Sequence, residues 1–451
     1  MFSSRLPKDI SPSPFFAELE RVKACAKKEA AEGGLPFIDM TVSSPVKVGL
    51  PIDLNAAVDE GRESFGCWNP DAAGWKSARE AVVEYYRERG GNFTAGQIIL
   101  TASTSEAYSV LFKTFCDPGD VILTPMPGYP LLDTLAQLEH LECAPYFLQL
   151  RRENARKLAT DERREGAAFR FVLDTDSLLA APKRAKILLL VSPHNPTGHC
   201  ISREEWNAAV RFCEENDMIL VVDEVFGDYA FSDKVKRTWE YVFGLCPPEP
   251  SLSQSSPSKS FSTEGRKSIH CRFNDFWDAG GGDFINLPED GPKCPIFWLN
   301  GLSKAVGSPQ LKLGWMAFYA PREHFEEIRA ALEFVEDAYL SVSAPAQALG
   351  SALLKQSAAY ESRVKERLLQ NWQTLREAFP SKYCPEVLGG WYAVVRLGED
   401  DEDLTLRLLR EKHVLVQPGF FFDFDEDGWV VISLLQEPAL FKEAVRRMAD
   451  R

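Results

Sequence analysis

Four short segments combine side chains that could do chemistry, and each lies at the end of an apolar run. They are TASTSE (101–106), SPHNPTG (192–198), VVDEVFGDY (221–229) and LNGLSKAVGSPQLKLGW (299–315). Together they supply hydroxyl groups, an amide, carboxylates and an amine, and an amine on a turn can act as a nucleophile or general base. Singly, each has an ordinary explanation, since Asn-Pro-Thr-Gly is a turn sequence and an Asp-Glu pair can cap a helix.

The elements that must position these segments alternate between strands and helices. Continuous Ile, Leu and Val runs predict buried strands, covered on both faces of a sheet, at 97–103, 120–127, 185–196, 218–226, 295–304 and 313–320. Helical segments at 104–116 and 202–216 lie between them, and Ser202 with Glu205 predicts a capping box for the second. This alternation predicts a doubly wound α/β domain, in which ligands bind at the carboxyl ends of the strands.

The pattern changes along the chain, which predicts two domains. Residues 48–320 form the large α/β domain. After residue 321 come three helical stretches, three strand-like runs and a closing helix, and we expect residues 1–47 to complete this smaller α+β domain. The stretch 232–294 is rich in Pro, Gly and Ser, and seven of the residues 251–262 are serine. It is interpreted as a flexible surface insertion, with a lid over the active site as the alternative.

Composition narrows the class of protein. The chain has 451 residues and a net charge of −15, which argues against nucleic acid and anionic membranes as partners. Its ten cysteines form no CxxC pair, so the common zinc and dithiol spacings are excluded and free thiols in a reducing compartment are expected. The N-terminus has no apolar signal segment, and no apolar run is long enough to span a membrane. A cytoplasmic enzyme without a metal is therefore predicted.

Taken together and in this order, the four segments resemble the class I/II aminotransferase family of fold type I enzymes that depend on pyridoxal 5'-phosphate. The signature is HNPTG, then a strand ending in Asp-Glu, then Ser-Lys with a basic residue eight positions later. The resemblance covers nearly the whole chain apart from 232–294. It implies a large domain with a mostly parallel seven-stranded sheet flanked by helices, a small α+β domain, and a homodimer.

The resemblance also implies roles for single residues. Lys304 matches the lysine that forms a Schiff base with the cofactor and moves the proton. Asp223 matches the carboxylate beneath the pyridine nitrogen, where an anion keeps that nitrogen protonated and the ring an electron sink. Asn195 matches the amide that donates to the ring 3-oxygen. Tyr129 falls where an aromatic side chain stacks on the ring, and a core tyrosine in a Pro-rich turn is the alternative.

The cofactor phosphate needs its own binding site. Ser103, Thr104 and Ser105 open the helix that begins at about residue 104, so backbone N–H groups and hydroxyls can converge on the dianion. Ser303 and Lys312 match two further phosphate contacts. Trp68 falls where relatives carry a tyrosine that reaches the phosphate of the neighbouring subunit, which suggests a site built at a dimer interface.

Several positions depart from the family pattern. Lys312 replaces an arginine, Gly301 replaces a serine, and Phe226 stands where a tyrosine usually donates to the ring 3-oxygen. A lysine provides a point charge instead of a bidentate fork.

The largest departure is Val431, which stands where relatives have the arginine that clamps the substrate carboxylate. An apolar side chain cannot bind a carboxylate by charge pairing. Either Arg62, Lys47 or Arg396 takes over this function, or the substrate is not an ordinary α-amino acid. The aromatic residues of 420–424 and Trp391-Tyr392 are interpreted as core, with an unusually apolar substrate pocket as the alternative.

Three functions are compared. The first is an aminotransferase that passes an amino group from an amino acid or amine to a keto or aldehyde acceptor. The second keeps the cofactor but acts as a lyase, decarboxylase, cyclase or oxidase, which Val431 favours. The third is a non-catalytic effector-binding or scaffold protein, and the intact set of Lys304, Asp223 and Asn195 argues against it.

Overall fold

A computed structural model describes residues 3–7, 13–154, 167–244, 288, 291–398 and 400–450. Most of the predicted insertion, including the serine-rich residues 251–262, lies outside these ranges, so its interpretation as a surface insertion or a lid is not tested. The described part of 232–294 contains one short helix, α8 (Glu240–Phe243), and the residues that lead into strand β8 (Ile296–Gly301).

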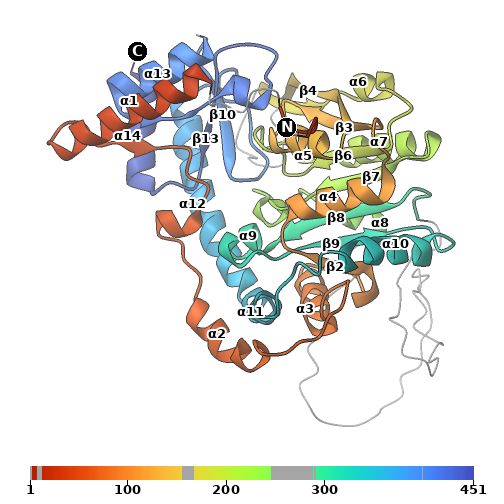
Figure 1. Ribbon diagram of the computed structural model, residues 1–451. Coiled ribbons are helices and arrows are strands. Elements are labelled where there is room, and N and C mark those ends of the chain that lie inside the picture. Colours follow the sequence, from red (N-terminus) through yellow and green to blue (C-terminus); the bar gives the residue numbers. More distant parts are fainter. Residues whose placement is uncertain are drawn as a thin grey trace, which may run out of the picture.

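A mixed sheet forms the centre of the molecule (Figure 1). In the described part of the chain it has eight strands in the order β2 (Ile98–Thr101), β9 (Gly314–Tyr319), β8, β7 (Ile219–Asp223), β6 (Ile187–Val191), β3 (Val121–Met126), β4 (Glu142–Asn154) and β5 (Ala167–Leu173). The pairs from β8 to β4 are parallel, and those of β2–β9, β9–β8 and β4–β5 are antiparallel.

The six predicted strands are confirmed, and the predicted number of seven strands is wrong. The extra strand is β5, which forms an antiparallel ladder with β4 from Leu148↔Leu173 to Asn154↔Ala167. Both strands carry polar and charged residues such as Arg151 and Arg170, because this edge of the sheet is partly exposed. The continuous apolar pattern that marks buried parallel strands is therefore missing there.

Helices cover both faces of the sheet, as the continuous apolar runs predict. Alternate residues point to opposite faces, so that Ile187 and Leu189 belong to one apolar cluster and Leu188 and Leu190 to the other. Against the first face pack α4 (Thr104–Phe115), α5 (Leu131–Leu138) and α10 (Phe325–Asp337). Against the second pack α3 (Lys76–Arg87) and α7 (Arg203–Glu215), and α7 begins with the predicted capping box of Ser202 and Glu205.

A second group of elements lies beside one end of the large sheet (Figure 1). Its three-stranded antiparallel sheet has the order β10 (Tyr392–Arg396), β13 (Trp429–Ser433), β12 (Gln417–Pro418). The N-terminal segment contributes β1 (Ile38–Asp39), which pairs in parallel with β11 (Val414–Leu415), and α1 (Pro14–Ala31), which packs on α13 (Asp401–Lys412). The long α12 (Ser357–Ala378) packs against the closing helix α14 (Pro438–Ala449).

The remaining helices connect these parts. They are α2 (Leu54–Gly61) and α11 (Ala344–Leu354), which pack together, α6 (Thr175–Ala180), and α9 (Leu302–Ala305) directly after β8. None of the helices in the described ranges is long and apolar enough to cross a membrane. The eight cysteines in these ranges are free thiols. The division into domains at residues 47/48 and 320/321 stays a prediction.

Candidate active site

Neighbouring strands of the large sheet end at one point and bring three predicted residues together. Asp223 is the last residue of β7, which pairs in parallel with both β6 and β8. The backbone N–H of Ser192 donates a 3.0 Å hydrogen bond to the Asp223 carbonyl, so the loop that carries Asn195 begins beside Asp223. Lys304 lies on α9, three residues after the end of β8. This is the edge at which open α/β sheets bind ligands.

The amine of Lys304 lies in an aromatic and largely dry environment. Its Nζ is 4.9 Å from the ring centroid of Trp391 and 5.4 Å from that of Phe226. Burial lowers the pKa of this amine to about 8, and the attraction of the Asp223 carboxylate partly opposes that shift. A lysine with such a pKa is neutral in a substantial fraction of molecules near neutral pH, as a nucleophile and proton carrier requires.

Asp223 is a partly buried carboxylate with a fixed orientation. The N–H of Val225 donates to Oδ1 at 3.0 Å, and the hydroxyl of Tyr108 donates to Oδ2 at 2.9 Å. Burial raises the pKa of Asp223, whereas these two donors and the charge of Lys304 act in the opposite direction. The carboxylate can therefore hold a cationic group close to it.

Asn195 lies on a loop that its neighbours hold on both sides. The N–H of His194 donates to the His199 carbonyl at 2.7 Å, and the N–H of Gly198 donates to the His194 carbonyl at 2.8 Å. Gly198 in turn accepts from the N–H of Leu388, just before β10. Burial lowers the pKa of His194 to about 3, so this histidine is a neutral structural residue next to Asn195.

The start of α4 fits an anion. The helix begins at Thr104, as predicted, and Ser103 is its N-cap, accepting a 3.2 Å hydrogen bond from Glu106 N–H. A Cβ at Gly314 in β9 would lie 3.0–3.1 Å from Ser103 and Thr104 backbone atoms, so the glycine permits a close approach. Lys312, two residues earlier, is exposed, and Ser303 is partly buried on α9.

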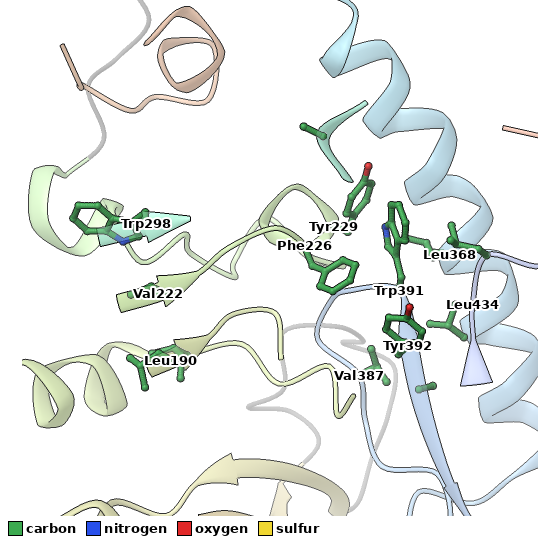
Figure 2. Packing of buried hydrophobic residues seen from close by; sticks show 14 of the residues in the cluster. Leu190, Val222, Phe226, Tyr229, Trp298, Leu368, Val387, Trp391, Tyr392 and Leu434 are labelled. Carbon is green, nitrogen blue, oxygen red and sulfur yellow. The ribbon is translucent and has the colours of Figure 1, made fainter. Parts of the chain in front are cut away.

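Aromatic residues from both parts of the molecule line the region around Lys304. Figure 2 shows Phe226 and Tyr229 facing Trp391 and Tyr392, with Phe226 5.5 Å and Tyr229 5.2 Å from Trp391 between ring centroids. Trp391 is fully buried, as its interpretation as a core residue predicts. Tyr129 is 45% exposed, so the alternative that it is a core tyrosine is wrong. The turn before it is tied to the 420–424 segment, because Gly128 N–H donates to the Phe422 carbonyl.

Trp68 lies on an exposed surface of the single chain. Its side chain is 82% exposed and lines a cavity of about 90 Å³ formed by parts of segments 67–75 and 336–347 together with Leu100.

Val431 offers no charge, Arg62 and Arg396 are engaged in ion pairs, and Lys47 stays a candidate for binding the substrate carboxylate. Val431 is fully buried in β13 and pairs in register with Val394. Arg62 forms an ion pair with Asp59. Arg396 forms one with Glu426, and Lys47 is exposed after the turn at Pro45.

Sequence reasoning missed two tyrosines that contact the predicted residues. Tyr108 donates to Asp223, and the Tyr229 hydroxyl donates to the Lys304 carbonyl at 2.6 Å. Tyr108 occupies the fifth position of a helix that begins at the predicted phosphate site, on an otherwise apolar face. A polar hydroxyl on that face was a usable signal. For Tyr229 the sequence offered no signal, because its partner is a backbone atom.

The residues present fit pyridoxal 5'-phosphate. The side-chain amide of Asn195 is not satisfied within the described part of the chain, because its oxygen Oδ1 is buried and has no hydrogen-bond partner there. The NH2 group of the same amide is the part that can donate to a ring oxygen. A lysine of lowered pKa, a partly buried carboxylate and a helix start lie around the same strand ends. The amine can react with the aldehyde of the cofactor, the carboxylate can pair with its protonatable ring nitrogen, and the helix start can bind its phosphate.

The fold resembles that of solved aminotransferase structures. The structure of an aminotransferase from Escherichia coli aligns with this chain at a TM-score of 0.72 and 19% sequence identity. The alignment covers 100% of this chain and 97% of the Escherichia coli chain. A double mutant of the aspartate aminotransferase of Thermus thermophilus aligns at a TM-score of 0.71 and 20% sequence identity. That alignment covers 100% of this chain and 99% of the Thermus thermophilus chain. These similarities define the architecture of a fold type I enzyme.

The family model for aminotransferases of class I and II matches residues 60–268 and 273–448. The chain belongs to this family. The glutamate-pyruvate aminotransferase AlaA of Haemophilus influenzae is 22% identical over 93% of this chain and 91% of that protein. The alanine aminotransferase of Mycobacterium tuberculosis is 24% identical over 84% of this chain and 77% of that protein.

The protein is therefore a pyridoxal-phosphate-dependent aminotransferase that uses an amino donor and a keto acceptor. The comparisons do not favour the lyase, decarboxylase, cyclase or oxidase alternative. The scaffold alternative fails as well, because the relatives are enzymes.

Proposed function

We propose that Lys304, Asp223 and Asn195 form the cofactor centre of this aminotransferase, with Lys304 attached to the cofactor through a Schiff base. The observation that carries this proposal is the meeting of Lys304 and Asp223 at the ends of the parallel neighbours β8 and β7. When bound, the cofactor ring draws electrons from the substrate carbon. Lys304 then moves the proton, Asp223 holds the positive charge of the ring nitrogen, and Asn195 donates to the ring oxygen.

The phosphate is held, in this proposal, by the start of α4 and by neighbouring side chains. Ser103, Thr104 and Ser105 present hydroxyls and free N–H groups, because the first N–H groups of a helix have no intrahelical partner. Ser303 and Lys312 add a hydroxyl and a positive charge. Tyr129 lies where its ring can cover the cofactor, and Phe226 contributes an apolar wall instead of a donor.

Replacement of Lys304 tests the centre. Lys304→Ala is expected to abolish covalent attachment of the cofactor and to lower kcat by at least roughly a thousandfold. Lys355→Ala is the matched control, because Lys355 is exposed and paired with Glu60 on another surface. Attachment is measured by mass spectrometry after borohydride reduction, and transfer by the passage of ¹⁵N from donor to acceptor. Full activity of Lys304→Ala would overturn the assignment.

We also propose that the active enzyme is a cytoplasmic homodimer in which Trp68 of each subunit lies at the partner's phosphate site. Trp68, which is 82% exposed, and Leu340, which is 40% exposed, line the same cavity and support an apolar surface that a second copy covers. Mixing inactive Lys304→Ala chains with Trp68→Ala chains tests this proposal. In a mixed dimer, Lys304 of one chain meets Trp68 of the other, so one site is intact and activity is regained. If each site were built from a single chain, the mixture would show only the residual activity of Trp68→Ala. Imaging of the tagged chain tests its location.

The substrate carboxylate is not held by a charge at position 431. We propose a substrate whose recognition is mainly apolar, supported by buried Val431 and by the aromatic side chains of Trp391, Phe226 and Tyr392 around Lys304. A donor screen with matched pairs of amino acids and their decarboxylated amines tests it. Comparable kcat/KM within such pairs supports the proposal, and a loss of more than roughly a hundredfold for the amines contradicts it.

A further inference from the structure

Tyr108 is a buried residue outside the predicted cofactor set that touches a member of it. It lies on α4, only 3% exposed, and its hydroxyl donates to Asp223 Oδ2 at 2.9 Å. We propose that Tyr108 is a positioning residue that fixes the Asp223 carboxylate and favours its ionised form. This inference rests on the proposed role of Asp223 at the cofactor ring nitrogen.

Strand geometry explains why the two residues meet. Val221 and Asp223 point to the face of the sheet that α4 covers, whereas Glu224 is bound on the other side by Arg237 and Thr238. Because Tyr108 belongs to the same apolar cluster as Val221, its ring is fixed by packing and its hydroxyl reaches beyond the apolar layer.

Two donors hold the two oxygens of the carboxylate. Val225 N–H binds Oδ1 and Tyr108 binds Oδ2, so rotation of the carboxylate plane would break at least one bond. The backbone donor is a consequence of the turn after β7. The hydroxyl of Tyr108 is the donor that a side chain supplies, and it can therefore be removed without altering the backbone.

The hydroxyl also acts on the charge of Asp223. Burial and the nearby Glu224 disfavour ionisation, while Lys304, Val225 N–H and Tyr108 favour it. Tyr146 also interacts electrostatically with Tyr108, and it is neutral at ordinary pH because burial raises its pKa. Burial and the charge of Asp223 raise the pKa of Tyr108, so it stays a donor. An ionised Asp223 favours a protonated ring nitrogen, which is the form that attracts electrons.

The experiment compares Tyr108→Phe with Tyr146→Phe. Tyr146 is equally buried, but its hydroxyl donates to the Leu189 carbonyl at 2.7 Å and not to Asp223. Cofactor affinity of the cofactor-free chains is measured by tryptophan fluorescence from pH 4 to 9. Cofactor affinity is expected to fall at low pH, where Asp223 becomes protonated. In Tyr108→Phe the midpoint of this fall is expected to move to higher pH by roughly one unit, because the ionised carboxylate loses a hydrogen bond. An unchanged midpoint, or the same shift in Tyr146→Phe, would overturn the inference.

Two further measurements keep the outcome decisive. If Tyr108→Phe does not fold, Tyr108→3-fluorotyrosine keeps the ring and makes a stronger donor, and the midpoint is expected to move down; no movement contradicts the inference. In an Asp223→Asn background, Tyr108→Phe is expected to have little additional effect. If Asp223→Asn itself binds the cofactor and reacts like the wild type, the proposed function of Asp223 is wrong. If only Tyr108→Phe is silent, the inference alone is wrong.

Discussion

The hydroxyl of Tyr229 donates a 2.6 Å hydrogen bond to the backbone carbonyl of Lys304. This bond connects the segment after β7 with the turn after β8, and the Tyr229 carbonyl accepts from Gly390 N–H just before β10. Tyr229 is fully buried, and its ring lies 5.2 Å from that of Trp391. Tyr229 thus connects the turn that carries the reactive amine with the segment that leads into β10, through its side chain on one side and its backbone carbonyl on the other.

We expect Tyr229→Phe to misplace the amine more than it harms the fold. Loss of the buried hydrogen bond costs about 1 kcal/mol of unfolding free energy, and kcat falls several-fold because the α9 turn loses an anchor. Urea denaturation and steady-state kinetics measure the two effects. Tyr241→Phe is the control, since Tyr241 donates to the Ile201 carbonyl away from Lys304. Equal loss of kcat in both variants would contradict the positioning role.

The pH dependence of cofactor capture should follow the amine of Lys304. Its pKa of about 8 means that the reactive neutral form increases as the pH rises through 8, and we expect the capture rate to rise with that midpoint. The unfolded chain binds the proton up to about pH 10.5, so the cofactor-free wild type also gains stability between pH 8 and 10.5. Stopped-flow absorbance and thermal unfolding measure these trends. Lys304→Met should show neither the rise in capture rate nor the gain in stability. A midpoint of the capture rate near pH 10.5 would disprove the lowered pKa of Lys304.

Glu336 should destabilise the folded chain at alkaline pH. Burial and the nearby Glu106 raise the pKa of Glu336 to about 8, and its Oε1 has no partner in the described residues. Because the unfolded chain loses this proton near pH 4.5, stability is lost as the pH rises from 4.5 to 8. Glu336→Gln is expected to be more stable than the wild type at pH 8 by on the order of 4 kcal/mol, and nearly equal at pH 4.5. Exposed Glu327→Gln is the control, and identical pH profiles of both variants would refute the expectation.

Restoring the family residues at two positions should have opposite results. A Cβ at Gly301 would lie 3.0 Å from Gly314 Cα and from the Leu313 carbonyl oxygen, so Gly301→Ser is expected to cost about 1–3 kcal/mol of stability. Lys312 is exposed, so Lys312→Arg is expected to fold normally and to bind the cofactor several-fold more tightly. Chemical denaturation and cofactor titration separate the two variants. A stable Gly301→Ser with improved binding would show that the two strands can move apart.

The sequence by itself determined the residue types at the strand ends and six of the strands that carry them. Continuous apolar runs predict parallel strands buried on both faces, and the capping box of Ser202 and Glu205 predicts where helix α7 begins. Lys304, Asp223 and Asn195 could be named because they match the motif of the class I/II aminotransferase family, each near the end of such a run. The outer strands β4 and β5 were not predicted, since a half-exposed edge lacks the apolar pattern.

Only the tertiary structure decided what surrounds these residues. The bonds Tyr108–Asp223 and Tyr229–Lys304 join positions 115 and 75 residues apart, and no local pattern encodes such pairs. The same holds for the lowered pKa of Lys304, which depends on burial by Trp391 and Phe226 from separate segments. Residue type fixes which groups are available for chemistry, whereas their charge state and orientation arise from contacts that form only when the chain has folded.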